Sequence, residues 1–356
     1  MMGSVLSGFG LKENDCSISV FGNGLINQTW KLTSRDQEWL LQRINHRVFT
    51  SPLKIMDNLR LLSEYFRENH PGYLFVGPVD TIDGLNYIKE RDDYYRLFPF
   101  IKNSYSCDTV YKPSLAFGAS AQFGKFTRLL ASFDPARLHV TLPDFHNLSL
   151  RYQQFFLAVK KGNSRRMGEC KEIIAYLESQ EEIVTIFEHI KLDPSFRSRV
   201  IHHDAKINNV LFDRSNDRGL CVIDLDTVMG GYFISDVGDM LRTYLSPAGE
   251  EDADFSRIEI REDYFSEIVK GYLGEMNSGL SAFEKQHFVY AGKFAIYMQA
   301  LRFLTDYLLD DIYYHITQEH QNLSRAKNQI VLLKRFLEKE AGLNKILERF
   351  LTNPET

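Results

Sequence analysis

The fold of this chain is decided by HHDAKINNVL at residues 202–211, which is followed by VIDLD at residues 222–226. In phosphoryl transfer from ATP, one carboxylate receives the proton of the acceptor hydroxyl. An amide oxygen five residues later and a carboxylate after the next strand hold Mg²⁺ on the phosphates. Asp204, Asn209 and Asp224 have these side chains at these spacings, and Lys206 is close enough in the loop to reach a γ-phosphate oxygen. The stretch therefore predicts an ATP-dependent kinase.

The surroundings of this motif support the same interpretation. Apolar residues Val210–Phe212 lead into a polar turn, and a second apolar segment, Leu220–Ile223, ends on Asp224. This pattern predicts a catalytic loop followed by a β-hairpin that delivers the metal-binding carboxylate. In the alternative, Asp204 and Asn209 would only form turns and Asp224 would end a strand. The joint motif favours the kinase interpretation.

Composition narrows the class of protein. With 356 residues, 44% of them hydrophobic and 25% charged, the chain is expected to form two lobes of an ordinary globular protein. A net charge of −5 gives no basic field for nucleic acid. The four cysteines lack C-x-x-C spacing, so we predict reduced thiols in a cytoplasmic protein. No apolar run approaches the ~18 residues of a membrane span, and no export signal is visible.

The first hundred residues are predicted to form mainly strands around one long helix. This helix spans Pro52 to Arg67, with Ile55, Leu59 and Leu62 on one face. The predicted strands are Ser17–Phe21, Ile26–Leu32, Glu38–Ile44, Tyr73–Val76, Gly84–Lys89 and Tyr94–Ile101. Such a sheet with one helix is typical of a lobe that clamps a nucleotide.

After Lys102 the periodicity becomes helical. The predicted helices are Ala116–Phe133, Ser149–Lys161, Arg166–Leu177, Glu181–Ile190, Val237–Leu245, Tyr264–Met276, Ala282–Tyr307 and Leu323–Phe350. We therefore predict an α+β, bilobal, protein-kinase-like fold. Its small antiparallel-sheet N-lobe would span residues 1–101. Its large, mostly helical C-lobe would span residues 102–356 and hold the catalytic loop, the metal site and the acceptor-binding helices.

Residues that contact the nucleotide are expected in the N-lobe. Gly22 and Gly24 form either a plain hairpin turn or a cover whose backbone N–H groups meet phosphate oxygens, with Asn27 and Thr29 assisting. The third strand carries Gln42 and Arg43 where a protein kinase has its phosphate-binding lysine. Arg43 could supply the cation, or Gln42 could occupy the equivalent position on the opposite face.

Other charged side chains near the motif have two interpretations each. Asp226 is either a second metal ligand or a hydrogen-bond acceptor at a strand end. His202 is expected to organise the loop through backbone hydrogen bonds, and Asp236 is expected to brace the same loop. The acidic run Glu250–Asp254 is expected to be a solvated loop.

These motifs carry a resemblance. The chain resembles the aminoglycoside phosphotransferase and choline kinase superfamily and, within it, the N-acetylhexosamine 1-kinases. Besides the catalytic loop, the matching segments are GNGLINQT (22–29), LQRIN (41–45), PDFHN (143–147), IDLDT (223–227), SDVGD (235–239), LRFLTDYL (301–308) and QNLSRA (321–326). They cover nearly the whole chain in family order, and the late segment with Arg302 carries most of the narrower resemblance.

The resemblance implies roles for single residues. Asp204 would be the catalytic base, and Asn209 and Asp224 would bind Mg²⁺. Arg302 and Tyr313 would contact the sugar. The implied reaction transfers the γ-phosphate of ATP to the anomeric hydroxyl of N-acetylglucosamine or N-acetylgalactosamine. His146 precedes a helix, so a helix cap and a sugar contact are both open.

Three alternatives stay open. A protein kinase shares the loop pattern, but neither D-F-G nor A-P-E occurs where such an enzyme needs them. Another small-molecule kinase of this fold could act on choline, homoserine or an aminoglycoside. A polycationic aminoglycoside would need an acidic cleft, for which Glu250–Asp254 is the conspicuous candidate, whereas Arg302 argues for an uncharged or anionic acceptor. Finally, a pseudokinase could bind nucleotide without turnover.

Overall fold

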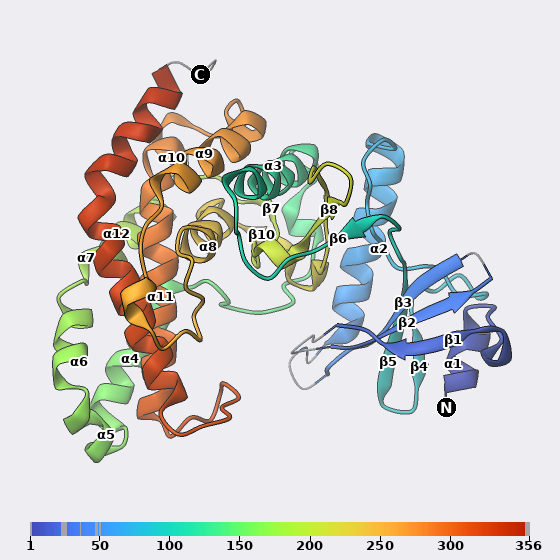
Figure 1. Cartoon of the computed structure of the whole chain (residues 1–356), viewed down its shortest axis with the longest axis horizontal. Helices are drawn as coiled ribbons and strands as arrows, with labels where there is room; N and C mark the ends of the chain where they lie inside the picture. Colours follow the sequence, from blue (N-terminus) through green and yellow to red (C-terminus); the bar gives the residue numbers. More distant parts are fainter. Residues whose placement is uncertain (1, 23–26, 36, 47–48, 50, 353–356) are drawn as a thin grey trace.

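The computed structural model of the chain describes residues 2–22, 27–35, 37–46, 49 and 51–352. Figure 1 shows a small sheet beside the N-terminus and a larger, mainly helical part that carries the C-terminus. The predicted α+β class, with a small antiparallel sheet and a large helical lobe, is confirmed.

One antiparallel sheet forms the smaller part, in the order β1-β2-β3-β5-β4. Its strands are β1 (Ser17–Val20), β2 (Gln28–Ser34), β3 (Gln37–Arg43), β4 (Ile88–Glu90) and β5 (Asp93–Pro99). The N-terminal helix α1 (Met2–Gly8), which the sequence analysis missed, buries Val5 and Leu6 in a small core with Leu32, Leu41 and Leu97. Because side chains alternate across a strand, this packing assigns the odd-numbered residues of β3 to the α1 face.

Helix α2 (Pro52–Asn69) begins as predicted, with proline in its first turn. Its buried face includes Ile55, Leu59 and Phe66, which follow helical spacing. These side chains belong to the large core of the helical part, where Phe66 stacks on Phe126 at 5.7 Å between ring centroids. Helix α2 thus lies between the sheet and the helices (Figure 1). The boundary between residues 101 and 102 stays a prediction.

The helical part is built on long buried helices. Its helices are α3 (Pro113–Leu129), α4 (Leu148–Lys161), α5 (Ser164–Glu169), α6 (Lys171–Glu178), α7 (Glu182–Leu192), α8 (Ile234–Tyr244), α9 (Glu262–Met276), α10 (Ala282–Gln286), α11 (Phe288–Leu308) and α12 (Gln321–Thr352). Helix α12 runs along α11 (Figure 1), and α3 packs on α9. In the described part of the chain, no helix combines the length and apolar character needed to cross a membrane.

Several predicted elements differ from the structure. Of the strand predicted over 84–89, only Ile88 and Lys89 lie in a strand, β4. Residues 73–76 form no strand, and Tyr73 and Phe75 instead stack on Phe66 of α2. The helix predicted over 166–177 is divided at Cys170 into α5 and α6, where ψ is near 10°. His287 divides α10 from α11 in the same way.

Candidate active site

The predicted hairpin holds the two ends of the motif side by side. Strand β8 (Val210–Asp213) pairs with β9 (Gly219–Val222), and Val210 lies opposite Val222. Asn209 immediately precedes the first strand and Asp224 follows the second, so the hairpin brings them together. The Ile223 N–H donates to the Asn209 carbonyl at 2.9 Å and closes this end. Strand β7 (Arg199–Ile201) enters the catalytic loop and pairs with β10 (Met229–Gly231), which leaves the site.

Asp236, at the start of α8, braces the catalytic loop as predicted. Its two carboxylate oxygens accept hydrogen bonds from the His202 and His203 N–H groups at 2.9 and 2.7 Å. His203 has a φ of +66°, a left-handed conformation that needs such support. Burial raises the pKa of Asp236 to about 6, although both hydrogen bonds favour the ionised form.

Removing this brace should destabilise the fold. Asp236→Ala leaves two buried N–H groups without acceptors, each of which costs about 1–3 kcal/mol. We expect the free energy of unfolding, measured by urea denaturation, to fall by about 3 kcal/mol. Asp254→Ala is the matched control, because Asp254 accepts hydrogen bonds from the N–H and hydroxyl of Ser256 at an exposed position. Equal losses in the two variants would contradict the bracing role.

His202 organises the loop through the backbone, which confirms its predicted role. Its Nε2 lies 2.9 Å from the Ile223 carbonyl oxygen, and its Nδ1 accepts the Asp204 N–H at 3.3 Å. A carbonyl oxygen only accepts, so the proton of the neutral ring resides on Nε2. The imidazole therefore fixes the backbone of Asp204 and is not free to carry a proton.

The Asp204 carboxylate is partly exposed and is held at both oxygens. Asn209 Nδ2 donates to Oδ2 at 2.9 Å, and Lys206 Nζ lies 3.2 Å from Oδ1. Burial works to raise the pKa of Asp204, but the charge of Lys206 and the hydrogen bonds from Lys206 and Asn209 leave that pKa below its usual value. Asp204 in turn raises the pKa of Lys206. The pair is ionised near neutral pH, with an acceptor oxygen and a cation side by side.

The predicted metal ligands offer oxygen atoms that accept no hydrogen bond from the described residues. Asn209 Nδ2 donates to the backbone oxygen and to Oδ2 of Asp204, both at 2.9 Å. Among the described residues, its Oδ1 accepts no hydrogen bond. The exposed Asp224 carboxylate likewise has no hydrogen-bond partner in the described chain. Desolvation by surrounding protein, with the charges of Asp226 and Asp204, raises the pKa of Asp224 to about 6. An amide oxygen beside an uncompensated carboxylate fits a hard cation that also binds substrate phosphates.

Asp226 is engaged differently from Asp224. Its oxygens accept from Arg96 Nη1 and Nη2 at 2.5 and 2.8 Å, and Asn27 Nδ2 donates to Oδ2 at 3.1 Å. Arg96 and Asp226 are 1% and 2% exposed. In the structure, Asp226 therefore acts as a hydrogen-bond acceptor, which is one of its two predicted roles.

Arg96 is a site residue that the sequence analysis missed. It lies on β5 directly opposite Gln42 of β3, and its Nε and Nη2 donate to Gln42 Oε1 at 3.1 and 2.9 Å. Gln42 in turn donates to Thr29 Oγ1 at 3.2 Å. The available signal was a single arginine in the otherwise apolar and aromatic strand YYRLF, because arginine is seldom buried without a partner.

The other predicted nucleotide residues divide into two groups. Asn27 joins the network, since its Oδ1 also accepts the Asn45 N–H at 3.0 Å. Gly22 has a φ of +71° and open space where a Cβ would point, while Gly24 lies outside the described residues. Arg43 is not brought to this site. It lies on the α1 face of β3 and donates to Asp93 at 3.2 Å.

Arg302 of α11 and Tyr313 come together in the helical part. The Arg302 guanidinium lies 5.5–5.9 Å from the ring centroids of Phe145, Tyr313 and Tyr314. Buried Asp306 fixes the tyrosine loop by accepting the N–H groups of Tyr313 and Tyr314 at 2.8 and 2.9 Å. We call Arg302 and these three rings the arginine–aromatic cluster. Phe145 and Tyr314 were not predicted from the sequence.

His146 connects this cluster to the catalytic loop. Its ring stacks on Phe145 at 4.5 Å and lies 5.6 Å from the ring of His203. Burial, followed by the charges of His203, Arg302 and other cations, keeps the pKa of His146 well below its usual value. Its Nδ1 is buried without a partner among the described residues. Asn147 caps α4 by accepting the Leu150 N–H at 3.2 Å.

The acidic run is a largely exposed loop, as predicted, and arginines hold it in place. Glu250 accepts from buried Arg242 at 2.8 Å, and Arg242 also binds Asp239. Glu251 pairs with Arg325 of α12, and Asp252 pairs with Arg257. The ion pairs compensate these carboxylates and tie the run to its neighbours.

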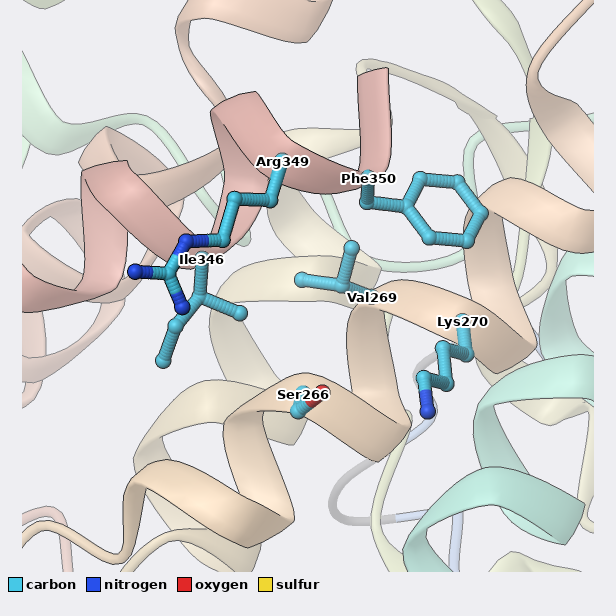
Figure 2. Close-up of a pocket in the computed structure, with 6 residues that line it drawn as sticks. All are labelled: Ser266, Val269, Lys270, Ile346, Arg349 and Phe350. Carbon is cyan, nitrogen blue, oxygen red and sulfur yellow. The ribbon is translucent and has the colours of Figure 1, made fainter. Parts of the chain in front are cut away.

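A surface hollow lies elsewhere on the helical part. Figure 2 shows Ser266, Val269 and Lys270 of α9 facing the last turns of α12, which contribute Ile346, Arg349 and Phe350. None of these residues belongs to the catalytic loop, the hairpin or the arginine–aromatic cluster. The hollow therefore plays no part in the site described above.

The comparisons with known proteins agree with this site. A model of the phosphotransferase enzyme family matches residues 17–265, well over half of the chain. This chain therefore belongs to the phosphotransferase enzyme family, as the resemblance predicted.

Solved structures share the fold across nearly the whole chain. An aminoglycoside phosphotransferase from Alicyclobacillus acidocaldarius matches with a TM-score of 0.66 and 13% identity, over 97% of this chain and 96% of that one. A Plasmodium vivax ethanolamine kinase matches with a TM-score of 0.58 and 13% identity, over 92% and 85%. A spectinomycin phosphotransferase, solved with ADP and spectinomycin, matches with a TM-score of 0.54 and 13% identity, over 93% of each chain.

Proposed function

We propose that this phosphotransferase moves the γ-phosphate of ATP to the anomeric hydroxyl of an N-acetylhexosamine and yields a sugar 1-phosphate and ADP. The observation that carries the acceptor class is the arginine–aromatic cluster, which His146 connects to the catalytic loop. Aromatic rings pack on sugar faces, while a guanidinium and a neutral imidazole can hydrogen-bond to hydroxyl or amide oxygens. The resemblance to N-acetylhexosamine 1-kinases in the Arg302 segment supports the same acceptor.

Asp204 would orient the acceptor and receive its proton. Its Oδ atoms are held by Asn209 and Lys206, so the carboxylate is fixed and ionised before the sugar arrives. A hydroxyl within ~3 Å of this carboxylate can transfer its proton as the new O–P bond forms. Lys206 would stabilise charge on the transferring phosphoryl group. Transfer is direct, so no protein side chain is phosphorylated.

We propose Mg²⁺ as the cofactor, with Asn209 Oδ1 and the Asp224 carboxylate as its protein ligands. Both oxygens are free of protein hydrogen bonds among the described residues. The bound ion would neutralise the phosphate charge during transfer. Asn209 also donates to Asp204, so one side chain would align the metal side and the base side of the reaction.

Two rival acceptor classes fit the cluster less well. A quaternary ammonium such as choline would need an aromatic cage for its own charge, but the Arg302 guanidinium already occupies the space between the rings. A polycationic aminoglycoside would need unpaired carboxylates, whereas Glu250, Glu251 and Asp252 are each paired with an arginine. An acceptor without positive charge is the one that these residues favour.

Replacing Arg302 should affect the acceptor more than the nucleotide. For Arg302→Gln we expect the acceptor KM to rise about 10- to 100-fold, since a charge-assisted hydrogen bond is worth roughly 1.5–3 kcal/mol. The KM for ATP should stay within about twofold, because the cluster is separate from the nucleotide-side network. Arg325→Gln is the control: Arg325 also lies against an aromatic ring, that of Phe303, but pairs with Glu251. Equal changes in both KM values would contradict the acceptor role.

The acceptor is tested by ADP release with Mg²⁺ and ATP across a panel. The panel contains N-acetylglucosamine, N-acetylgalactosamine, galactose, choline, homoserine and kanamycin. We expect turnover with an N-acetylhexosamine. Turnover with choline, homoserine or kanamycin instead would reject the acceptor assignment and retain the kinase chemistry. Nucleotide binding without turnover of any acceptor would favour an untested acceptor or a pseudokinase.

A further inference from the structure

The sheet face that meets the nucleotide lacks the usual cation. Kinases of this fold carry on β3 a lysine that contacts the α- and β-phosphates and pairs with a glutamate of the following helix. Here the corresponding side of β3 carries Gln42, which is uncharged. Arg96 lies opposite it on β5 and donates two hydrogen bonds to its side-chain oxygen. The cation is therefore displaced by one strand and stays on the same face.

The other candidates for this role are engaged elsewhere. Arg43 lies on the α1 face of β3, where it binds Asp93. Helix α2 supplies no carboxylate to the sheet among its described contacts, since Glu64 pairs with Arg60 of the same helix. The carboxylate that meets the sheet is Asp226, from the segment that follows the hairpin.

The position of Arg96 fits a phosphate ligand. Asp226, two residues after Asp224, accepts hydrogen bonds from the Arg96 guanidinium and from Asn27, which lies just after the predicted glycine cover. Arg96 donates to both oxygens of Asp226. A guanidinium can donate to two oxygens of a phosphate in the same geometry. Because the pair is almost fully buried, a phosphate can reach these donors only by displacing the carboxylate.

We propose that Arg96 binds the α- and β-phosphates of the nucleotide, and that Asp226 occupies its guanidinium until the nucleotide displaces it. This inference rests on the ATP-dependent function proposed above. The proposal predicts that replacing the arginine and replacing the aspartate of this ion pair have opposite effects on nucleotide affinity. Loss of Arg96 weakens nucleotide binding, and loss of the Asp226 charge strengthens it. An ion pair with only a structural role would weaken binding, or leave it unchanged, in both variants.

The test is calorimetric titration of ADP and of adenosine, with EDTA present so that no metal contributes. Arg96→Gln should weaken ADP binding about 10- to 100-fold, the range expected for a charge-assisted hydrogen bond. Asp226→Asn should strengthen ADP binding about two- to tenfold, because the competing carboxylate is removed. Adenosine affinity should be unchanged in both variants. Weaker ADP binding in both variants, or unchanged binding in Arg96→Gln, overturns the proposal.

Matched variants separate this role from loss of stability. Arg199→Gln also breaks a largely buried arginine–carboxylate pair, with Glu284, and should lower the Tm without changing ADP affinity. Where Arg96→Gln fails to fold, Arg96→Gln/Asp226→Asn removes the uncompensated charge and should still show the weak ADP binding. A loss of ADP affinity confined to Arg43→Gln would assign the role to Arg43 and reject Arg96.

The same titration keeps this inference distinct from the proposed function. A wild-type protein that binds neither ADP nor adenosine, with Mg²⁺ as well as with EDTA, would reject an ATP-dependent function altogether. A wild-type protein that binds ADP, together with an Arg96→Gln variant that binds it equally, would reject the role of Arg96 alone.

Discussion

Asp204→Asn should lower kcat by about 10²- to 10⁴-fold, the usual contribution of a positioned general base. The amide keeps the size of the side chain but cannot accept the acceptor's proton. Nucleotide affinity should stay within about twofold, because in the proposed mechanism Asp204 meets the acceptor hydroxyl and touches neither the metal nor the phosphates. Steady-state ADP release and calorimetric nucleotide binding measure the two effects separately.

Asp213→Asn is the control for this prediction. Asp213 ends β8 of the same hairpin and accepts hydrogen bonds from Ser215 at an exposed turn. Its replacement should leave kcat unchanged. Full turnover in Asp204→Asn would show that another group receives the proton, and it would remove the assignment of the base.

Asp224→Ala should lower kcat by roughly 10³-fold and weaken binding of the Mg²⁺–nucleotide complex at least about tenfold. The reason is that the Asp224 carboxylate is the unpaired negative charge beside the free amide oxygen of Asn209. With EDTA present, the variant should bind ADP as well as the wild type or better, since a negative charge has been removed. Calorimetry with and without Mg²⁺ measures this difference.

Asp217→Ala provides the comparison for Asp224→Ala. Asp217 lies in the turn of the same hairpin and pairs with Lys112 away from the loop. It should bind the Mg²⁺–nucleotide complex like the wild type. An Asp224→Ala variant with unchanged Mg²⁺ dependence would contradict the proposed metal role.

The catalytic loop was predictable because its geometry is local. Asp204 and Asn209 are five residues apart, and the hairpin that returns the chain to Asp224 is readable from apolar segments around a polar turn. The same holds for Asp236, whose contact with His202 spans only one hairpin and one short strand. Sequence patterns over such short stretches predict both the secondary-structure elements and the side chains that these elements bring to the site.

The role of Arg96 could not be predicted, because it depends on two contacts with residues far away in the sequence. Its contact with Gln42 requires the register of β3 on β5, across 54 residues. Its contact with Asp226 requires the sheet to dock on the helical part, across 130 residues. Neither long-range contact can be predicted from the spacing of residues in the sequence. The side-chain packing of α2 on the larger core escaped prediction for the same reason.

The acceptor residues were only partly predictable. Arg302 and Tyr313 came from a resemblance, while Phe145 and Tyr314 emerged once α11 and the segment before α4 lay side by side. Asp306 lies within the segment that carried the resemblance, yet its role in holding the tyrosine loop is visible only from its hydrogen bonds. Convergence of side chains from separate helices is a property of packing and not of local pattern.

The central claim is that phosphate is transferred to the anomeric oxygen of an N-acetylhexosamine. The most direct measurement is NMR of the product formed from ATP and N-acetylglucosamine or N-acetylgalactosamine, with the 1-O-methyl glycoside of each sugar as a blocked acceptor. We expect a phosphorus resonance coupled to the anomeric proton and no product from the methyl glycosides. A phosphate at another hydroxyl, or turnover of the methyl glycosides, would contradict it.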